Sequence, residues 1–222
     1  MAISAKDVML EAIQRDAKAC ALFTDIHGFS SQVVEAIRSV PRDAFVPESL
    51  KSYAWENRPL PIGHGQTISQ PFIVALMTAL LEPKPMDRVL EVGTGCGYQA
   101  AILSLLVQDV YTIEIVEPLA REAAERLKRY SNVHPRVGDG YHGWPEYAPY
   151  QGIVVTAGVD VVPPALLEQL ASPGRLVIPV SSGRDAMDLL IVEKSETGEI
   201  SQRPTIPVAF VPFTREEKDA DD

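Results

Sequence analysis

After Pro85 the chain alternates between apolar runs of strand length and amphipathic stretches of helix length. Strands are predicted at 88–93, 109–115, 133–137, 151–157, 174–180, 187–193 and 206–213, and helices at 97–107, 118–130 and 164–171. Strands that alternate with helices predict an α/β fold with a mostly parallel sheet covered on both faces. Only a turn around residues 196–198 separates the last two strands, so this part of the sheet is expected to be antiparallel.

The residues before Pro85 show a different pattern. A first helix is predicted from four apolar residues at spacings of four, four and three: Met9, Ile13, Ala17 and Cys20. A second, short helix around 33–37 should end before Pro41, because the residue before a proline disfavours helical backbone. The proline- and glycine-rich segment 41–65 is expected to be a loop. A third helix should begin at Pro71, and its apolar residues on every side predict burial.

The length and composition indicate one globular unit. A chain of 222 residues is long enough for one α/β domain, and a content of 46% hydrophobic and 23% charged residues is typical of soluble proteins. We therefore interpret 1–222 as a single domain. Within it, 1–84 is an N-terminal helical extension, 85–214 is the α/β core, and 215–222 is a frayed acidic tail.

Charge and cysteine content narrow the range of partners. No apolar run approaches the roughly 20 residues that a membrane-spanning helix needs, and the first residues form an amphipathic helix rather than a signal peptide. Cys20 and Cys96 are too few and too far apart for a disulfide framework, and the histidines lack the spacing of metal ligands. The net charge of −10 argues against a nucleic-acid partner. We expect a cytoplasmic monomer without a membrane or metal partner.

The segment RVLEVGTGCG at 88–97 is the most informative motif. A predicted strand runs into Gly93, Gly95 and Gly97, and a helix-forming stretch follows. Glycine allows turn conformations that other residues avoid and lets a ligand lie against the main chain, while the free N–H groups of the next helix face that ligand. The motif therefore predicts a site for a nucleotide-like cofactor, although a purely structural tight turn is the alternative.

Two acids indicate which cofactor this loop binds. The spacing is G-x-G-x-G rather than the G-x-G-x-x-G of dinucleotide sites, since Tyr98 stands where the last glycine would be. Glu91 precedes the loop and would repel a pyrophosphate, but it suits the positive charges of S-adenosylmethionine. Glu114, 23 residues further on at the end of the second core strand, can accept hydrogen bonds from ribose hydroxyls.

The pair Asp139 and Gly140 follows the third core strand in VGDG. Asp139 is a candidate acceptor for an adenine amino group, and Gly140 would allow close backbone approach. An Asp-Gly pair is also a common turn. Its place at the carboxyl end of a strand, where open α/β sheets bind ligands, keeps the binding role open.

The segment GQTISQP at 65–71 places Ser69 just before the helix that begins at Pro71. A hydroxyl beside the free N–H groups of a helix N-terminus suits a carboxylate ligand. Capping of the helix by this serine is the alternative, and the local sequence alone favours it. No G-x-S-x-G elbow is present, so a hydrolase serine is not expected.

Taken together, these segments resemble the protein-L-isoaspartate O-methyltransferase family. The resemblance runs from VPRDAFVP at 40–47 through GQTISQP and RVLEVGTGCGYQAA to FVPFT at 210–214, and GQTISQP and FVPFT are its most specific parts. It implies a Rossmann-like, doubly wound class I methyltransferase. Such an enzyme uses S-adenosylmethionine to esterify the free carboxylate of L-isoaspartyl residues in damaged proteins and peptides, which begins repair through a succinimide. A class I methyltransferase acting on RNA or a small molecule is the alternative, and a non-catalytic binding module is a third hypothesis.

The resemblance also implies roles for individual residues. Ser69 would be catalytic and hold the substrate carboxylate near the methyl group. The expected cofactor-binding residues are Gln66, Thr67, Ile68, Ser69, Glu91, Gly93, Gly95, Cys96, Gly97, Glu114, Asp139, Gly140 and Thr214. Cys96 stands where the family often has serine, and Gln151 stands where it usually has aspartate. A carboxylate is ionised at pH 7, so it needs no general base, and catalysis would rest on orientation.

Overall fold

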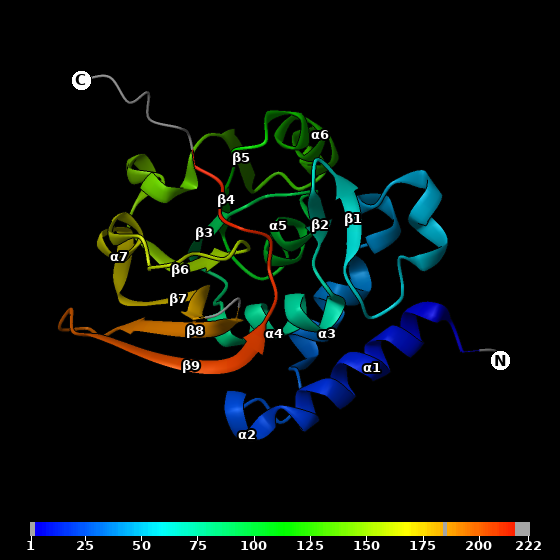
Figure 1. Cartoon of the computed structure of the whole chain (residues 1–222), viewed down its shortest axis with the longest axis horizontal. Coiled ribbons are helices and arrows are strands. Elements are labelled where there is room, and N and C mark those ends of the chain that lie inside the picture. Colours follow the sequence, from blue (N-terminus) through cyan, green and yellow to red (C-terminus); the bar gives the residue numbers. More distant parts are fainter. Residues whose placement is uncertain (1–2, 184–185, 216–222) are drawn as a thin grey trace.

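A seven-stranded sheet forms the centre of the computed structural model, which describes residues 3–183 and 186–215 (Figure 1). Its strands are β3 (Arg88–Val92), β4 (Asp109–Glu114), β5 (Val133–Val137), β6 (Tyr150–Val155), β7 (Leu170–Gly183), β8 (Ala186–Lys194) and β9 (Ile200–Val208). The order is β5-β4-β3-β6-β7-β8-β9. The strands from β5 to β7 are parallel, and β8 and β9 are antiparallel to their neighbours. The predicted mostly parallel α/β sheet is confirmed.

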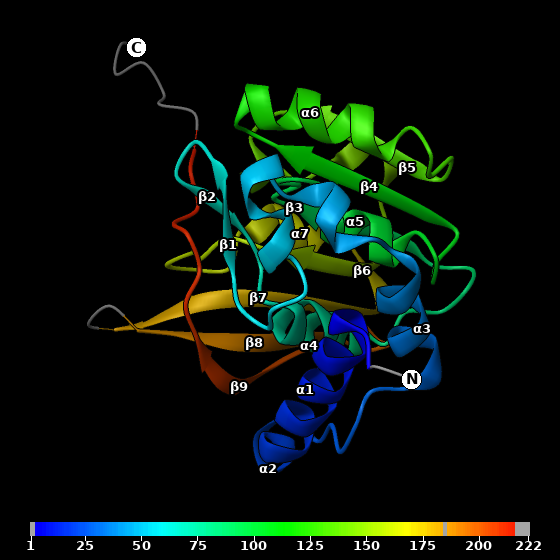
Figure 2. The ribbon, with the colours of Figure 1, turned by 90° about the vertical axis from the view of Figure 1, so that its right-hand side faces the viewer.

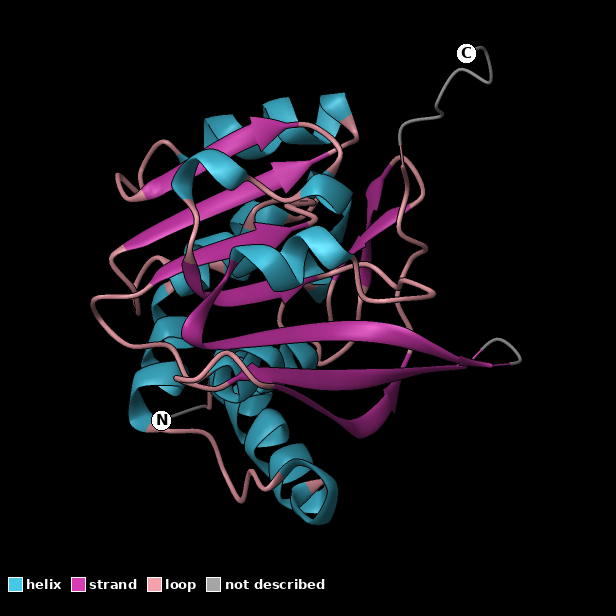
Figure 3. Ribbon diagram, turned by 90° about the vertical axis from the view of Figure 1, so that its left-hand side faces the viewer, coloured by secondary structure: helices cyan, strands magenta, loops and turns pink. Residues whose placement is uncertain are grey.

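Helices cover both faces of this sheet, as the sequence predicts, but more of them lie on one face than on the other (Figure 3). They are α1 (Ala5–Ala19), α2 (Ala21–Thr24), α3 (Ser31–Ser39), α4 (Pro71–Leu81), α5 (Tyr98–Leu103), α6 (Glu117–Leu127) and α7 (Pro164–Gln169). Residues of α1, α3, α4, α5 and α6 share one buried cluster with Val89 of β3, while Leu166 of α7 packs in a second cluster with Leu90 and Val92. Because side chains alternate along a strand, the two clusters lie on opposite faces.

The helix α4 is buried because it lies between two layers. It contacts α1 and α3 on one side and β6 and β7 on the other. Leu76 and Ala75 are completely buried, and both Phe72 near its start and Leu81 at its end belong to the core as well. The burial predicted from the apolar FIVALMTALL stretch is confirmed. Since α4 follows the GQTISQP segment directly, its packing fixes that segment against the sheet.

The prediction of a loop over 41–65 is wrong. The segment contains two 3-10 helices, Arg42–Phe45 and Glu48–Tyr53, and the strand β1 (Leu60–Gly63), which pairs with β2 (Gln66–Ile68) in an antiparallel hairpin (Figure 2). Elements this short carry no readable periodicity. The hairpin turn uses positive φ angles at its three turn residues, 95° at Gly63, 51° at His64 and 71° at Gly65, and the two flanking glycines adopt such angles readily.

Several predicted element boundaries also differ from the structure. The last strand, predicted at 206–213, is β9 at Ile200–Val208, because the polar sequence of this edge strand lacks apolar alternation. Residues 210–214, an apolar run followed by Thr214, instead form an irregular strap, which pairs with Gly158. The helix predicted at 97–107 ends at Leu103, and α2 was not predicted. The expected frayed tail lies outside the described residues apart from Arg215.

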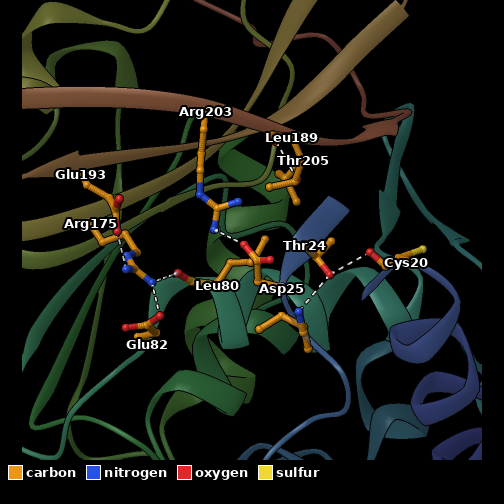
Figure 4. A network of polar contacts seen from close by, with 11 residues as sticks. Cys20, Thr24, Asp25, Leu80, Glu82, Arg175, Leu189, Glu193, Arg203 and Thr205 are labelled. Atoms are coloured by element: carbon orange, nitrogen blue, oxygen red, sulfur yellow. Dashed lines mark hydrogen bonds and ion pairs between the residues drawn. The ribbon is translucent and has the colours of Figure 1, made fainter. Parts of the chain in front are cut away.

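Ion pairs fasten the helices to the antiparallel edge of the sheet (Figure 4). Arg175 of β7 forms an ion pair with Glu82, which directly follows α4, at 2.5 Å, and a second with Glu193 of β8. Arg203 of β9 lies 3.7 Å from Asp25, which follows α2. Such half-exposed pairs contribute little stability each, but they define how α2 and α4 meet the sheet.

Candidate functional site

The carboxyl ends of β3 and β4 open into a cavity of about 780 Å³, its mouth included. Its walls are the turn after β3, the strand β2 with the residues that follow it, the residues after β6, and the strap at 211–214. The strand order reverses at β3, since the chain continues from β3 to β4 and β5 on one side and then crosses to β6 on the other side of β3. Open α/β sheets bind ligands at such a point.

The cavity brings together residues that are far apart in the sequence. All of the predicted site residues except Gly97 and Asp139 line it: Gln66, Thr67, Ile68, Ser69, Glu91, Gly93, Gly95, Cys96, Glu114, Gly140 and Thr214. Gly97 instead precedes α5 as its N-cap residue, with a φ of 92°. The Asp139 carboxylate accepts a hydrogen bond from the N–H of Tyr141 and lies 3.8 Å from the Arg215 guanidinium.

Hydrogen bonds to neighbouring parts of the sheet hold the turn after β3. The N–H of Gly93 donates to the carbonyl of Ile113 at the end of β4, at 2.8 Å. Gly93 has a φ of 94°, and a Cβ at this position would lie 2.3 Å from the hydroxyl oxygen of Thr156. That hydroxyl donates to the Gly93 carbonyl at 2.6 Å. Glycine is therefore required here by the backbone conformation and by a neighbouring side chain.

Glu114 braces this turn, a role that the sequence analysis missed. One carboxylate oxygen accepts the N–H of Gly95 at 2.7 Å, and the other accepts the N–H of Val116 at 2.9 Å. The side chain is buried, with 6% of the residue exposed. Each carboxylate oxygen has a further lone pair, so both can still accept hydroxyl groups from a ligand in the cavity.

Glu91 is completely buried beneath the cavity. Thr112 donates its hydroxyl to one carboxyl oxygen at 2.5 Å, and Thr112 is itself hydrogen-bonded to Thr94. The other oxygen, Oε1, has no partner among the described residues. Burial raises the pKa of Glu91 to about 8, so the carboxyl is neutral at pH 7 in the unliganded protein. A ligand cation placed beside Oε1 would favour the ionised form.

Ser69 lies between β2 and α4. Gln70, rather than Ser69, is the N-cap residue of α4, and it makes no capping bond through its side chain. The N–H of Phe72 in the first turn is instead satisfied by the side-chain oxygen of Asn57 at 3.0 Å. The capping role favoured by the local sequence is therefore wrong for Ser69. Ser69 lines the cavity, and its backbone carbonyl accepts a hydrogen bond from Arg42 at 2.9 Å.

Other lining residues were not named from the sequence. They are Val74, Val92, Thr94, Tyr98, Gln99, Ile113, Ile115, Val116, Thr156, Ala157, Val211, Pro212 and Phe213. Five of them follow directly on a parallel strand, and the rule that ligands bind at strand ends was the signal that could have found these: Thr94, Ile115, Val116, Thr156 and Ala157. The strap residues could not be found by this rule, since only tertiary contacts bring them to the site. One such contact is the hydrogen bond from the N–H of Phe213 to the carbonyl of Gly158 at 2.9 Å.

Metal-binding clusters and membrane-spanning helices are absent from the part of the chain that the structure describes. Residues 3–183 and 186–215 contain no group of three or more histidine, cysteine or acidic side chains arranged to hold a metal ion. None of the helices over the same ranges is long and apolar enough to span a membrane.

Comparison with known proteins decides the family. The model of the protein-L-isoaspartate(D-aspartate) O-methyltransferase family matches residues 21–218. The chain belongs to this family. A Cupriavidus necator relative, protein-L-isoaspartate O-methyltransferase 1, is 55% identical over 92% of this chain and 80% of its own length. The resemblance inferred from GQTISQP, the glycine loop and FVPFT is thereby confirmed.

Solved structures agree with the fold. A protein-L-isoaspartate O-methyltransferase matches with a TM-score of 0.80 at 27% identity; the match covers 93% of this chain, which spans 65% of that longer chain. A Plasmodium falciparum protein solved in complex with S-adenosyl-L-homocysteine matches with a TM-score of 0.77 at 23% identity, over 96% of this chain and 100% of its own. The Rossmann-like fold is confirmed.

Gly93 provides a test of the turn geometry. Both Gly93→Ala and Gly63→Ala place a side chain at a φ near 95°, which costs about 1–3 kcal/mol of unfolding free energy. Only Gly93→Ala also meets Thr156, which should cost a further ~1–3 kcal/mol through overpacking. Urea unfolding of the two variants measures the difference. Equal losses would show that Thr156 does not constrain the turn.

The raised pKa of Glu91 predicts a pH-dependent stability. The folded protein holds the Glu91 proton up to about pH 8, whereas the unfolded chain releases it near the ordinary value of 4.5. The stabilising contribution of this proton is complete below the lower value and is lost as pH rises through the higher one. Relative to Glu91→Gln, the wild type should therefore lose stability between about pH 5 and pH 8.

Urea unfolding of both proteins across this range checks the prediction. The Glu196→Gln variant, which changes an exposed acid on a turn, is the control and should show no such trend. A constant difference between wild type and Glu91→Gln would mean that Glu91 is ionised in the folded protein.

Proposed function

We propose that this protein transfers a methyl group from S-adenosylmethionine to the free carboxylate of L-isoaspartyl residues in damaged proteins and peptides. The resulting ester closes to a succinimide and so begins repair. One observation carries the proposal: Ser69 and the turn after β3 line the same cavity, although they belong to different parts of the chain. The family match and the names of the relatives support it.

The cavity fits the proposed cofactor. The unpartnered Oε1 of Glu91 is suited to the methionyl ammonium group, and Gly93 with Gly95 leaves the backbone beside it open. Glu114 would accept the ribose hydroxyls. The bound S-adenosyl-L-homocysteine of the Plasmodium falciparum structure supports a cofactor of this class. When bound, the cofactor supplies the electrophilic methyl carbon.

Further residues complete the proposed cofactor site. Gln66, Thr67 and Ile68 of β2 would form one wall, with Cys96 in the turn and Thr214 on the strap opposite. Gly140 lines the cavity and would lie against the adenine. Packing also requires glycine there, because a Cβ would come 2.3 Å from Val92. Asp139, which directly precedes the lining residue Gly140, would accept a hydrogen bond from the adenine amino group. Gly97 would orient the first turn of α5.

Ser69 would hold the substrate. Its hydroxyl can donate to the substrate carboxylate, and the positive end of α4 lies beside it. The carboxylate is ionised at neutral pH and attacks the methyl carbon as the nucleophile, so no general base is required. The protein's contribution would be to hold two reactants in line and to exclude water, so the reaction needs no catalytic dyad.

The proposal extends to the setting of the enzyme. The partners would be isoaspartyl-containing proteins and peptides, and the net charge of −10 disfavours a nucleic-acid substrate. We propose a monomer, because one copy of the chain supplies the lining of the cavity, and a cytoplasmic setting, which the two unpaired cysteines favour. A membrane partner is not part of the proposal.

Transfer of labelled methyl groups to a synthetic isoaspartyl peptide tests the function directly. The matching aspartyl peptide is the control, and only the isoaspartyl peptide should be labelled. The Ser69→Ala variant should lower kcat/KM for the peptide about 10- to 100-fold, because a hydrogen bond to a charged group contributes roughly 1.5–3 kcal/mol. Its affinity for the cofactor should stay within about threefold of wild type, the equivalent of under 1 kcal/mol.

The control variant for Ser69 is Ser52→Ala, which alters an exposed serine away from the cavity and should leave both quantities unchanged. Labelling of both peptides alike, or of neither, would contradict the proposed function. An unchanged rate for Ser69→Ala would leave the function standing but remove the serine from it.

A further inference from the structure

Arg42 is the largest completely buried side chain of the described structure. It begins the 3-10 helix Arg42–Phe45, within a segment expected to be a loop. All of its hydrogen bonds go to backbone carbonyls: Nη1 donates to Ala54 at 2.5 Å, and Nη2 donates to Arg58 at 3.2 Å and to Ser69 at 2.9 Å. One side chain therefore connects three separate points of the N-terminal extension.

The charge of Arg42 is not neutralised within the described residues, where none of the ion pairs includes its guanidinium. Its Nε also has no partner there. Burial lowers the pKa of Arg42, but a guanidinium stays charged at neutral pH. A buried cation without an anion is costly, since burying a charge normally requires a partner of opposite sign. The unliganded protein therefore contains a buried positive charge that is hydrogen-bonded to the Ser69 backbone carbonyl.

Arg42 also lies beside Tyr98, a residue of the cavity wall. Its guanidinium carbon lies 5.8 Å from the centre of the Tyr98 ring, and Phe45 packs edge-on against the same ring at 5.5 Å. Tyr98 is the first residue of α5, directly after the glycine turn, and lines the cavity. Arg42 thus joins the segment that holds Ser69 to the turn that would hold the cofactor.

We propose that Arg42 is a positioning residue for the methyl transfer. Its hydrogen bond fixes the Ser69 backbone relative to the glycine turn, and its unpaired charge favours a carboxylate at the Ser69 hydroxyl. A displacement of about 1 Å at such a site can lower a rate 100-fold, because the reacting atoms must stay aligned. A positive charge in a dry site also attracts an anion more strongly than one in water. This inference rests on the proposed function.

Three variants separate the contributions of Arg42. Arg42→Lys keeps the charge but loses the planar fork, and Arg42→Met loses both. Arg58→Met is the matched control, since Arg58 lies nearby but its side chain is half exposed and paired with Glu56. Circular dichroism confirms folding, calorimetry gives the Kd for S-adenosyl-L-homocysteine, and steady-state kinetics gives kcat and KM for the isoaspartyl peptide.

The expected result is a selective loss of substrate turnover. Arg42→Lys should lower kcat/KM at least about 10-fold and Arg42→Met about 100-fold, whereas the Kd for S-adenosyl-L-homocysteine should stay within about threefold of wild type. Arg58→Met should match wild type throughout. If Arg42→Met does not fold, Arg42→Lys decides the question. Wild-type turnover by Arg42→Lys, or a parallel loss of cofactor affinity, would overturn the proposal.

A crystal structure of Arg42→Lys gives a readout that does not depend on activity. Residues 68–70 should move by more than the roughly 0.5 Å within which a catalytic group must be held. An unmoved Ser69 would overturn the positioning role. Because the wild-type peptide assay alone decides the proposed function, failure of that function and failure of this inference can be told apart.

Discussion

The hydrogen bond from the Gly95 N–H to the Glu114 carboxylate is the contact on which the rest of the site depends. It joins the turn after β3 to the end of the neighbouring strand β4, and the bond from Gly93 to the carbonyl of Ile113 repeats that connection. These bonds hold the turn in place without a ligand. The residues around Ser69, packed through α4, and the strap, paired with Gly158, are placed against this fixed turn. A cofactor held there meets a site that is already assembled, so little ordering is left for the moment of reaction.

Two buried groups in this site are electrostatically incomplete in the protein alone. Glu91 holds a proton that a carboxyl in water would release, and one of its oxygens has no partner among the described residues. Arg42 holds a positive charge that no described carboxylate neutralises. The proposed reactants would supply the missing opposite charges. The cofactor would place its ammonium group beside Glu91, and the substrate would place its carboxylate at Ser69, on the side where Arg42 lies. An acidic protein can in this way attract an anionic group at one point of its surface.

Much of the architecture could be predicted from the sequence, because it depends on local patterns. The core strands alternate with amphipathic helices, and α4 shows its burial through apolar residues on every side. The glycine loop and GQTISQP likewise predicted where the cavity lies. The 3-10 helices and the hairpin β1–β2 were missed because each is too short to show a recognisable periodic pattern. The last strand was misplaced because Ile200–Val208 mixes polar residues with two prolines and shows no apolar alternation, while the apolar residues that follow it form the strap. The contacts of Asn57, Thr156 and Arg42 could not be predicted, since each joins positions that only the folded chain brings together.

The central claim is that one cavity holds the cofactor on the turn after β3 and the substrate carboxylate at Ser69. A crystal structure with S-adenosyl-L-homocysteine and an isoaspartyl peptide tests it most directly. The account predicts the homocysteine amino group beside Glu91, the ribose on Glu114, and the peptide carboxylate within hydrogen-bond distance of the Ser69 hydroxyl. A carboxylate bound elsewhere, or a cofactor lying outside the turn between β3 and α5, would contradict it.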